Sequence, residues 1–244
     1  MENKQELIMN NRERVRDYGE VFTPVKIVND ILDMPGLKEA SRSIGKRFLE
    51  PAAGEGVFLV QVLLRKLTTV ACDQMLSLTG FENYSLFALS SLYGIELLED
   101  NAQRCGKNLY ETYYDFYKKM ALKHGKDVKK NVLQSARFII SKNIVQGDFL
   151  KRLTSDGRPI VFTEWKITNL QKGTKELLVQ RTEYTLDQIF NKAALEAQRP
   201  LPDGTIEVQE TIDSLIPSVR PRKNRPVPIT EIYRGDEIDG SNGY

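Results

Sequence analysis

The sequence has few of the residues on which several classes of enzyme depend. Among its 244 residues there are one histidine and two cysteines. The histidine, His124, lies in a hydrophilic stretch typical of a solvated helix end, so a catalytic histidine–serine or histidine–cysteine pair is excluded unless His124 itself serves. Cys72 and Cys105 show no metal-ligand spacing and are too few for a disulfide framework. We therefore expect free thiols in a reducing compartment and no metal site.

Long apolar runs and a strong net charge are also missing. No run approaches the ~20 apolar residues that a membrane-spanning helix needs, and the first 20 residues are too charged for a secretory signal. We expect a cytoplasmic protein without a membrane partner. The formal net charge is +2, so the chain as a whole has no strong attraction to nucleic acid. Any basic surface that binds nucleic acid must therefore be local.

Composition and periodicity predict three parts. An N-terminal helical segment is expected over 1–45, a core over 46–199, and a loosely ordered tail rich in proline, glycine and charge over 200–244. The tail is expected to hold at most one short strand or helix, near 206–216. Strands alternate with helices through residue 165, which predicts an α/β sandwich with a mainly parallel sheet.

Hydrophobic patterns predict the elements of this core. Thr23 is expected to cap a helix whose first turn holds Pro24. Further helices are predicted at 56–76, 83–92, 99–125 and 186–198, and strands at 47–51, at 92–97, within 138–147, at 158–167 and at 175–186. Gly80 is expected to interrupt the chain before the helix at 83–92. The last two strands are expected to form a hairpin.

The stretch RFLEPAAGEGVFLV, residues 47–60, places a carboxylate and two glycines between a strand and a helix. Ligands of open α/β sheets bind beyond the carboxyl ends of the strands. Gly54 and Gly56 allow a tight turn and a close approach of a ligand, since they have no Cβ. Glu50 disfavours a phosphate there, and the Lys-Ser or Lys-Thr pair of a phosphate-binding loop is missing. The turn therefore indicates a cationic ligand.

S-adenosylmethionine is such a ligand, because it carries a sulfonium and an α-amino group. Glu96 ends the next predicted strand, where a carboxylate can hold the ribose diol. Asp148 ends a third strand, where it can accept a hydrogen bond from the adenine amine, and Phe149 can offer a ring face. We therefore predict S-adenosylmethionine as the cofactor.

At these residues the chain resembles the adenine-specific DNA methyltransferases of restriction–modification systems, which act on an exocyclic amine. The segment GEVFTPVKIV, 19–28, resembles the motif of that family in which Phe22, Thr23 and Pro24 open a helix beside the methionine moiety. The segment LEPAAGEGVFL, 49–59, resembles its glycine motif, which begins with an acidic residue followed by Pro51 and Ala52.

Two shorter segments extend the resemblance over roughly residues 15–165. YGIEL, 93–97, resembles the segment with the ribose-binding acid, and VQGDFL, 145–150, resembles the segment that contacts adenine. The resemblance implies a Rossmann-like methyltransferase sandwich, S-adenosylmethionine as cofactor and DNA as partner and substrate.

The chain departs from this family where the target base is held. The Asn-Pro-Pro-Tyr motif that holds a flipped adenine occurs nowhere, and the corresponding strand reads RPIVFTEWKITNL. As catalytic candidates, Glu164 can accept a hydrogen bond from the amine and Trp165 can stack on the base. The alternative for Trp165 is a packing role within the core.

The tail offers one candidate surface for DNA. Arg220, Arg222, Lys223 and Arg225 lie among prolines and can follow a phosphate backbone, or they can form a solvated linker. Three functions remain open at this point. They are an active DNA adenine methyltransferase, an inactive cofactor-binding subunit or regulator with a partner subunit that supplies target recognition, and a non-enzymatic DNA-binding protein. The near-neutral charge disfavours the third.

Overall fold

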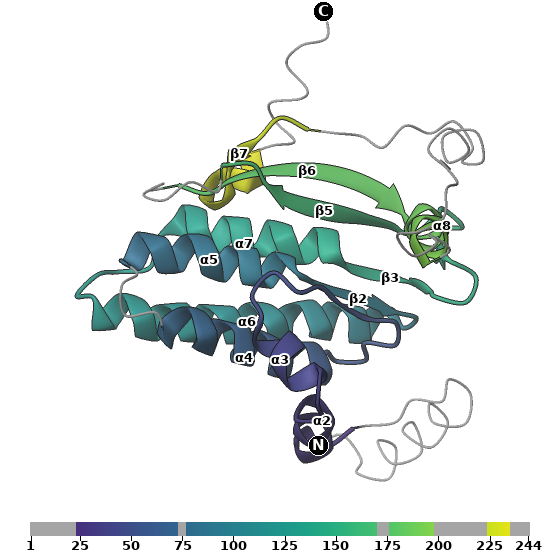
Figure 1. The fold of residues 1–244 in the computed structure, drawn as a ribbon, viewed down its shortest axis with the longest axis horizontal. Helices are drawn as coiled ribbons and strands as arrows, with labels where there is room; N and C mark the ends of the chain where they lie inside the picture. Colours follow the sequence, from purple (N-terminus) through teal and green to yellow (C-terminus); the bar gives the residue numbers. More distant parts are fainter. Residues whose placement is uncertain (1–22, 73–76, 170–175, 198–223, 235–244) are drawn as a thin grey trace, which may run out of the picture.

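The computed structural model describes residues 23–72, 77–169, 176–197 and 224–234, and within these ranges the chain has an α/β fold. Strands β1 (Phe48–Glu50), β2 (Leu92–Glu96) and β3 (Ile144–Asp148) pair in parallel in that order, and the short β4 (Leu153–Thr154) pairs antiparallel with β3 (Figure 1). The expected mainly parallel sheet is therefore confirmed.

Four long helices surround these strands. Figure 1 shows α4 (Val57–Cys72) and α6 (Glu99–Lys123) in one layer, and α5 (Leu78–Ser90) and α7 (Lys130–Asn143) in the next. The last two helices lead almost directly into β2 and β3. Leucines on α4, among them Leu59, Leu63 and Leu67, are fully buried between these layers. No helix of the described ranges has the length and apolar composition that crossing a membrane requires.

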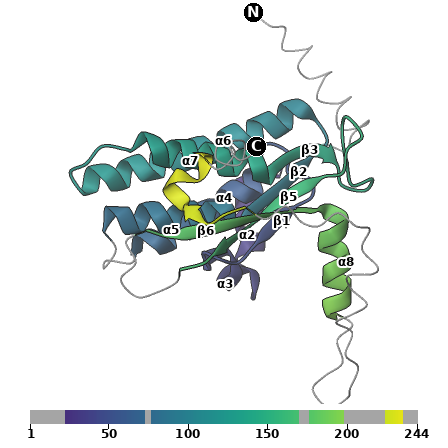
Figure 2. The same ribbon diagram turned by 90° about the horizontal axis from the view of Figure 1, so that it is seen from above.

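A second sheet covers the side of α5 and α7 that faces away from α4 and α6. It consists of β5 (Val161–Ile167), β6 (Leu178–Thr185) and β7 (Val227–Pro228), paired antiparallel. Figures 1 and 2 show the hairpin of β5 and β6 across this layer, with α8 (Leu186–Ala197) projecting at one end. The expected hairpin is confirmed, but it lies outside the parallel sheet.

Asn143 connects the hairpin to the parallel sheet. It is 1% exposed, and its side-chain amide donates to the carbonyl oxygens of Ser90 and Leu92 at 3.0 and 2.9 Å. Its oxygen accepts the indole N–H of Trp165 at 2.9 Å. The Tyr93 hydroxyl adds a hydrogen bond of 2.9 Å to the Thr163 carbonyl. These polar contacts fix the hairpin across the points where α5 and α7 become strands.

Some elements differ from the sequence prediction. The strand expected within 138–147 begins only at Ile144, because residues 138–143 complete α7, whose Ile139 and Ile140 are buried in the core. Gly80 does not interrupt the chain, because it lies in the first turn of α5 and donates to the capping Ser77 hydroxyl at 3.2 Å. The helix thus begins before the glycine.

Residues 224–234 are more ordered than the composition of the tail indicates. The 3-10 helix η1 (Ile229–Arg234) packs against α7 and buries Ile229 and Ile232 completely. The predicted loose order is therefore wrong for this segment, since two apolar side chains at helical spacing dock it. The short element expected near 206–216 lies outside the described residues.

Two short helices precede β1 within the expected N-terminal segment. Helices α2 (Val25–Leu32) and α3 (Leu37–Arg42) pack against α4, and Val28 and Leu32 are the buried residues of α2. The cap of α2 is Pro24 rather than Thr23, and no side chain caps the helix. Arg65 of α4 donates to the Leu32 carbonyl at 2.9 Å and so secures the end of α2.

Lys66 of α4 fixes the chain that enters β1. Its side chain is fully buried, and its ammonium donates to the carbonyls of Ser43 and Ile44 at 2.8 and 3.3 Å. It also donates to the carbonyl of Lys46 at 2.5 Å and to the Ser91 hydroxyl at 2.8 Å. One side chain therefore provides hydrogen-bond donors for three backbone carbonyls of the connection from α3 to β1.

We expect Lys66→Met to lower the free energy of unfolding by about 1–3 kcal/mol, because buried carbonyls lose their donor while the apolar volume is kept. Urea denaturation of the full chain measures this change. Lys107→Met is the control, since Lys107 is exposed on α6, and we expect a change within about 0.5 kcal/mol. A loss for Lys66→Met as small as the control's would contradict this role.

Candidate functional site

The predicted carboxylates end three neighbouring strands. Glu50, Glu96 and Asp148 are the last residues of β1, β2 and β3, which run parallel. Glu50 lies beside Gly94, and Glu96 lies beside Gln146. Since adjacent strands are about 4.8 Å apart, all three residues lie at one edge of the sheet. The register staggers them, because Gly94 and Gln146 each lie two residues before the end of their strand, so Glu96 extends beyond Glu50 and Asp148 extends beyond Glu96.

The glycine turn after β1 is joined to the end of β2. The Gly54 N–H donates to one Glu96 carboxylate oxygen at 2.7 Å, and the Ala53 N–H donates to the Ile95 carbonyl at 2.9 Å. The other Glu96 oxygen accepts the Leu98 N–H at 3.0 Å, next to the start of α6. Glu96 is 8% exposed. Its carboxylate therefore holds the turn and the following helix in a fixed arrangement.

The two glycines of the turn differ in what a side chain would meet at each position. Gly54 has a φ of +53°, and a Cβ built there meets no heavy atom within 4 Å. Gly56 has a φ of +84°, and a Cβ there would lie 2.7 Å from the Cys105 sulfur. The prediction that both glycines admit a ligand therefore fits Gly54, whereas Gly56 is required for packing against α6.

Glu50 is a half-buried carboxylate whose charge is only weakly stabilised by its neighbours. Burial raises its pKa, and the hydrogen bond that it accepts from the Ala52 N–H is long at 3.4 Å. No ion pair to Glu50 forms among the described residues. A group of this kind gains from a cationic ligand or from a hydrogen-bond donor. The adjacent Pro51 and Ala52 are exposed at the turn.

Asp148 is already engaged by its own loop. One carboxylate oxygen accepts the N–H groups of Leu150 and Lys151 at 2.9 and 3.1 Å, and the other lies 3.1 Å from the Lys151 ammonium. The backbone hydrogen bond from Lys151 lowers the pKa of Asp148, with help from its ammonium. The ring of Phe149 packs 5.9 Å from that of Phe190. This pair shapes the loop after β3.

The catalytic candidates on β5 lie elsewhere. Trp165 is 7% exposed, donates to Asn143 and stands edge-on to Phe138, with ring centroids 6.4 Å apart. Glu164 forms an ion pair of 3.1 Å with Arg47. This corrects the prediction for Trp165, because its buried ring has no free face for a base. The packing alternative is the one that holds, since β5 belongs to the covering sheet.

The remaining predicted residues are only partly described. Thr23 and Pro24 are exposed at the start of α2, and Phe22 lies outside the described residues. Of the basic residues in the tail, Arg225 is described and exposed, whereas Arg220, Arg222 and Lys223 lie outside. The chain is fixed just before Arg225, where the Asn224 N–H donates to the Arg181 carbonyl at 3.0 Å.

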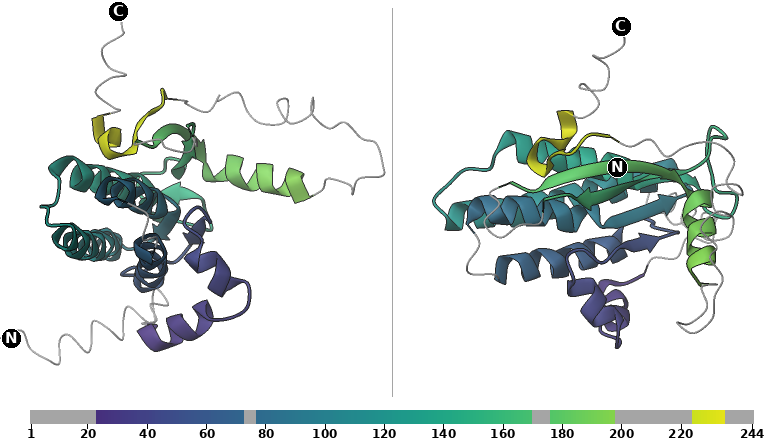
Figure 3. Two further views of the ribbon diagram at one scale, coloured as in Figure 1. Left: turned by 60° about the vertical axis from the view of Figure 1, so that its left-hand side comes forward. Right: turned by 45° about the horizontal axis from the view of Figure 1, so that its top comes forward.

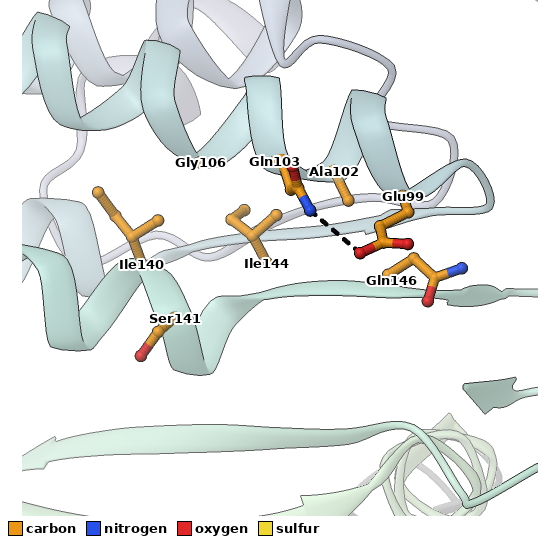
Figure 4. A pocket seen from close by; sticks show the side chains of 8 residues that line it. All are labelled: Glu99, Ala102, Gln103, Gly106, Ile140, Ser141, Ile144 and Gln146. Carbon is orange, nitrogen blue, oxygen red and sulfur yellow. Dashed lines mark hydrogen bonds between the residues drawn. The ribbon is translucent and has the colours of Figure 1, made fainter. Parts of the chain in front are cut away.

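A groove beside β3 was not predicted from the sequence. It has a volume of about 340 Å³ and runs between α6 and the junction of α7 with β3 (Figure 4). Its lining is Glu99, Ala102, Gln103, Gly106, Ile140, Ser141, Ile144 and Gln146. No motif connects these residues, because they come from separate elements. Within the described ranges, no group of three or more His, Cys, Asp or Glu side chains is arranged to hold a metal ion.

We expect the two cysteines to differ sharply toward a thiol reagent at about pH 8. Cys72 is exposed, whereas burial, with Glu96 and Glu50 nearby, raises the pKa of Cys105 to about 12. Folded protein should therefore be modified at Cys72 alone, and Cys105 should react only in denaturant. Mass spectrometry after alkylation measures both sites. Modification of Cys105 in folded Cys72→Ser protein would contradict this arrangement beside Gly56.

Comparisons of the chain with protein-family models, with curated proteins and with solved structures gave no match. The function therefore has to be argued from the geometry of the strand ends.

Proposed function

We propose that the chain binds S-adenosylmethionine at the ends of β1, β2 and β3, and that it methylates the exocyclic amine of adenine in DNA. Its α/β core would then be a Rossmann-like methyltransferase fold. The observation that carries the proposal is the 2.7 Å hydrogen bond from the Gly54 N–H to Glu96. It joins the side-chain-free turn to the next strand's acid, at the sheet edge where open α/β folds bind ligands.

The residues at this edge fit the cofactor. The open space at Gly54 leaves room for a ligand against the backbone. Glu96 uses two of its acceptor positions for backbone N–H groups. An ionised carboxylate has about four such positions, so Glu96 can still accept from ribose hydroxyls. Glu50, which lacks a cation among the described residues, is the group that would favour the positive charge of the ligand.

The bound cofactor would supply an activated methyl group, and the chain would hold it at the sheet edge. Transfer to an adenine amine also requires that the base be held in line with the methyl group. DNA would approach from the open side of the turn. The basic residues of the tail remain the candidate contact to its phosphates.

A second candidate function is a cofactor-binding subunit whose catalytic groups come from another chain. The observation that favours it is the position of Trp165, which is buried against Phe138 and bound to Asn143. Glu164 is also occupied by Arg47. The Trp165 ring is therefore not available to stack on a base, and the Asn-Pro-Pro-Tyr motif is missing from the sequence. A partner subunit would then hold the adenine.

We expect Gly54→Val to abolish S-adenosylmethionine binding in isothermal titration calorimetry, because the branched side chain fills the open space at the turn. Gly125→Val is the matched control, since Gly125 has a φ of +63° and equally open surroundings. Both variants should lose about 1–3 kcal/mol of stability from backbone strain. Retained affinity in Gly54→Val, or an equal loss in both variants, would reject the site.

Transfer of a radiolabelled methyl group to mixed-sequence DNA separates the two functions. Full-length protein that binds the cofactor and labels DNA alone is the active methyltransferase, and Trp165→Phe should then keep most of its activity. Binding without labelling assigns the chain to the second function. Absence of cofactor binding in the unmodified protein would overturn both.

A further inference from the structure

The end of the molecule opposite the strand ends is rich in lysine. Helix α6 begins directly after the tip of β2 and has 25 residues, so its C-terminus is about 37 Å away. There it turns into α7, and Figures 1 and 3 show this connection at the far end from the carboxyl ends of β1, β2 and β3. We call residues 118–130 the lysine end.

The charge of the lysine end contrasts with that of the whole chain. The segment has six lysines and one aspartate, so its formal charge is +5, while the chain carries +2. The other residues together are therefore negative. The lysines are Lys118, Lys119, Lys123, Lys126, Lys129 and Lys130. Positive charge is thus concentrated on the connection between two helices.

Most of these lysines have no acidic partner among the residues that the structure describes. Lys129 pairs with the buried Glu82 at 2.7 Å, and Lys118 lies 5.9 Å from the Tyr114 ring centroid. Lys119, Lys123 and Lys126 are exposed and form no ion pair within the described ranges. Like charges on one segment repel one another, and an anion that binds there relieves the repulsion.

Helix stability does not account for the whole set. A lysine in the last turn of α6 favours that helix, because the C-terminus of a helix carries partial negative charge. At the start of α7 the situation is reversed. Lys129 is the cap and Lys130 the first residue, and the first turn has no acidic side chain. Glu82 offsets the charge of Lys129, whereas the charge of Lys130 at this positive helix end is unfavourable and attracts anions.

We propose that the lysine end binds the phosphate backbone of nucleic acid without reading its sequence. Lysine is depleted in protein–protein interfaces, whereas interfaces with nucleic acid are more polar and more positive. Lysine also acts as a point charge on phosphate, which suits contacts that carry no sequence information. The large exposed apolar side chain here is Leu122, so the surface lacks the apolar centre of a protein interface. The proposal does not depend on cofactor binding at the strand ends.

The test compares two triple variants that remove the same charge. Lys119→Gln/Lys123→Gln/Lys126→Gln neutralises the lysine end. Lys26→Gln/Lys38→Gln/Lys46→Gln neutralises exposed lysines on or near α2 and α3. Affinity for labelled duplex DNA of mixed sequence is measured by fluorescence anisotropy between about 50 and 200 mM salt. Circular dichroism and urea denaturation check that both variants fold.

We expect the first variant to bind DNA more weakly and to lower the slope of log affinity against log salt by about 2–3, as for three lost phosphate contacts. The control variant should change the slope by less than about 1. If both variants lose DNA affinity equally, the loss follows net charge rather than the lysine end, and the proposal is overturned. An unchanged slope in the first variant would overturn it too. The same variants are also titrated with polyglutamate. If the first variant loses binding to polyglutamate but keeps its binding to DNA, the surface belongs to an acidic protein and the proposal is overturned.

Discussion

The carboxylate of Glu96 is the interaction on which the arrangement of the candidate site depends. It accepts the N–H of Gly54 from the turn after β1 and the N–H of Leu98 before α6. A buried carboxylate without hydrogen-bond donors would be costly, so the burial of Glu96 depends on these two N–H groups. Because Gly54 has a positive φ and no neighbour at its Cβ position, the turn can present bare backbone to a ligand. The tips of β1 and β2 therefore act as one unit.

Asn143 has a comparable role for the second sheet. It bonds to the junction of α5 with β2 and to Trp165 of β5, and it is itself the last residue of α7. Three segments that are distant in sequence thus meet at one side-chain amide. This explains why Trp165 is a structural residue. The same hydrogen bond and the contact of Trp165 with Phe138 hold β5 against α7.

The two ends of α6 carry opposite charges. Glu99 and Asp100 lie in its first turn, beside the carboxylates of the strand ends, and Lys123 lies in its last turn. Both placements agree with the helix dipole, which favours acids at the N-terminus and bases at the C-terminus. The continuation of lysines into α7 goes beyond this rule. Carboxylates thus gather at one end of α6 and lysines at the other, an asymmetry that a net charge of +2 does not reveal.

The sequence by itself determined the local elements and the order of the strand ends. Hydrophobic spacing predicts a helix over 56–76, of which the structure describes Val57–Cys72, and Glu50, Gly54 and Glu96 stand out in the sequence because each lies at or just after the end of a predicted strand. Only the tertiary structure decided the roles of Gly56 and Trp165. Their neighbours, Cys105 and Asn143, are distant in sequence, and local pattern carries no information about which side chains meet. For the same reason, the sequence placed a strand within 138–147 but not its first residue, and the structure ends α7 at Asn143 and begins β3 at Ile144.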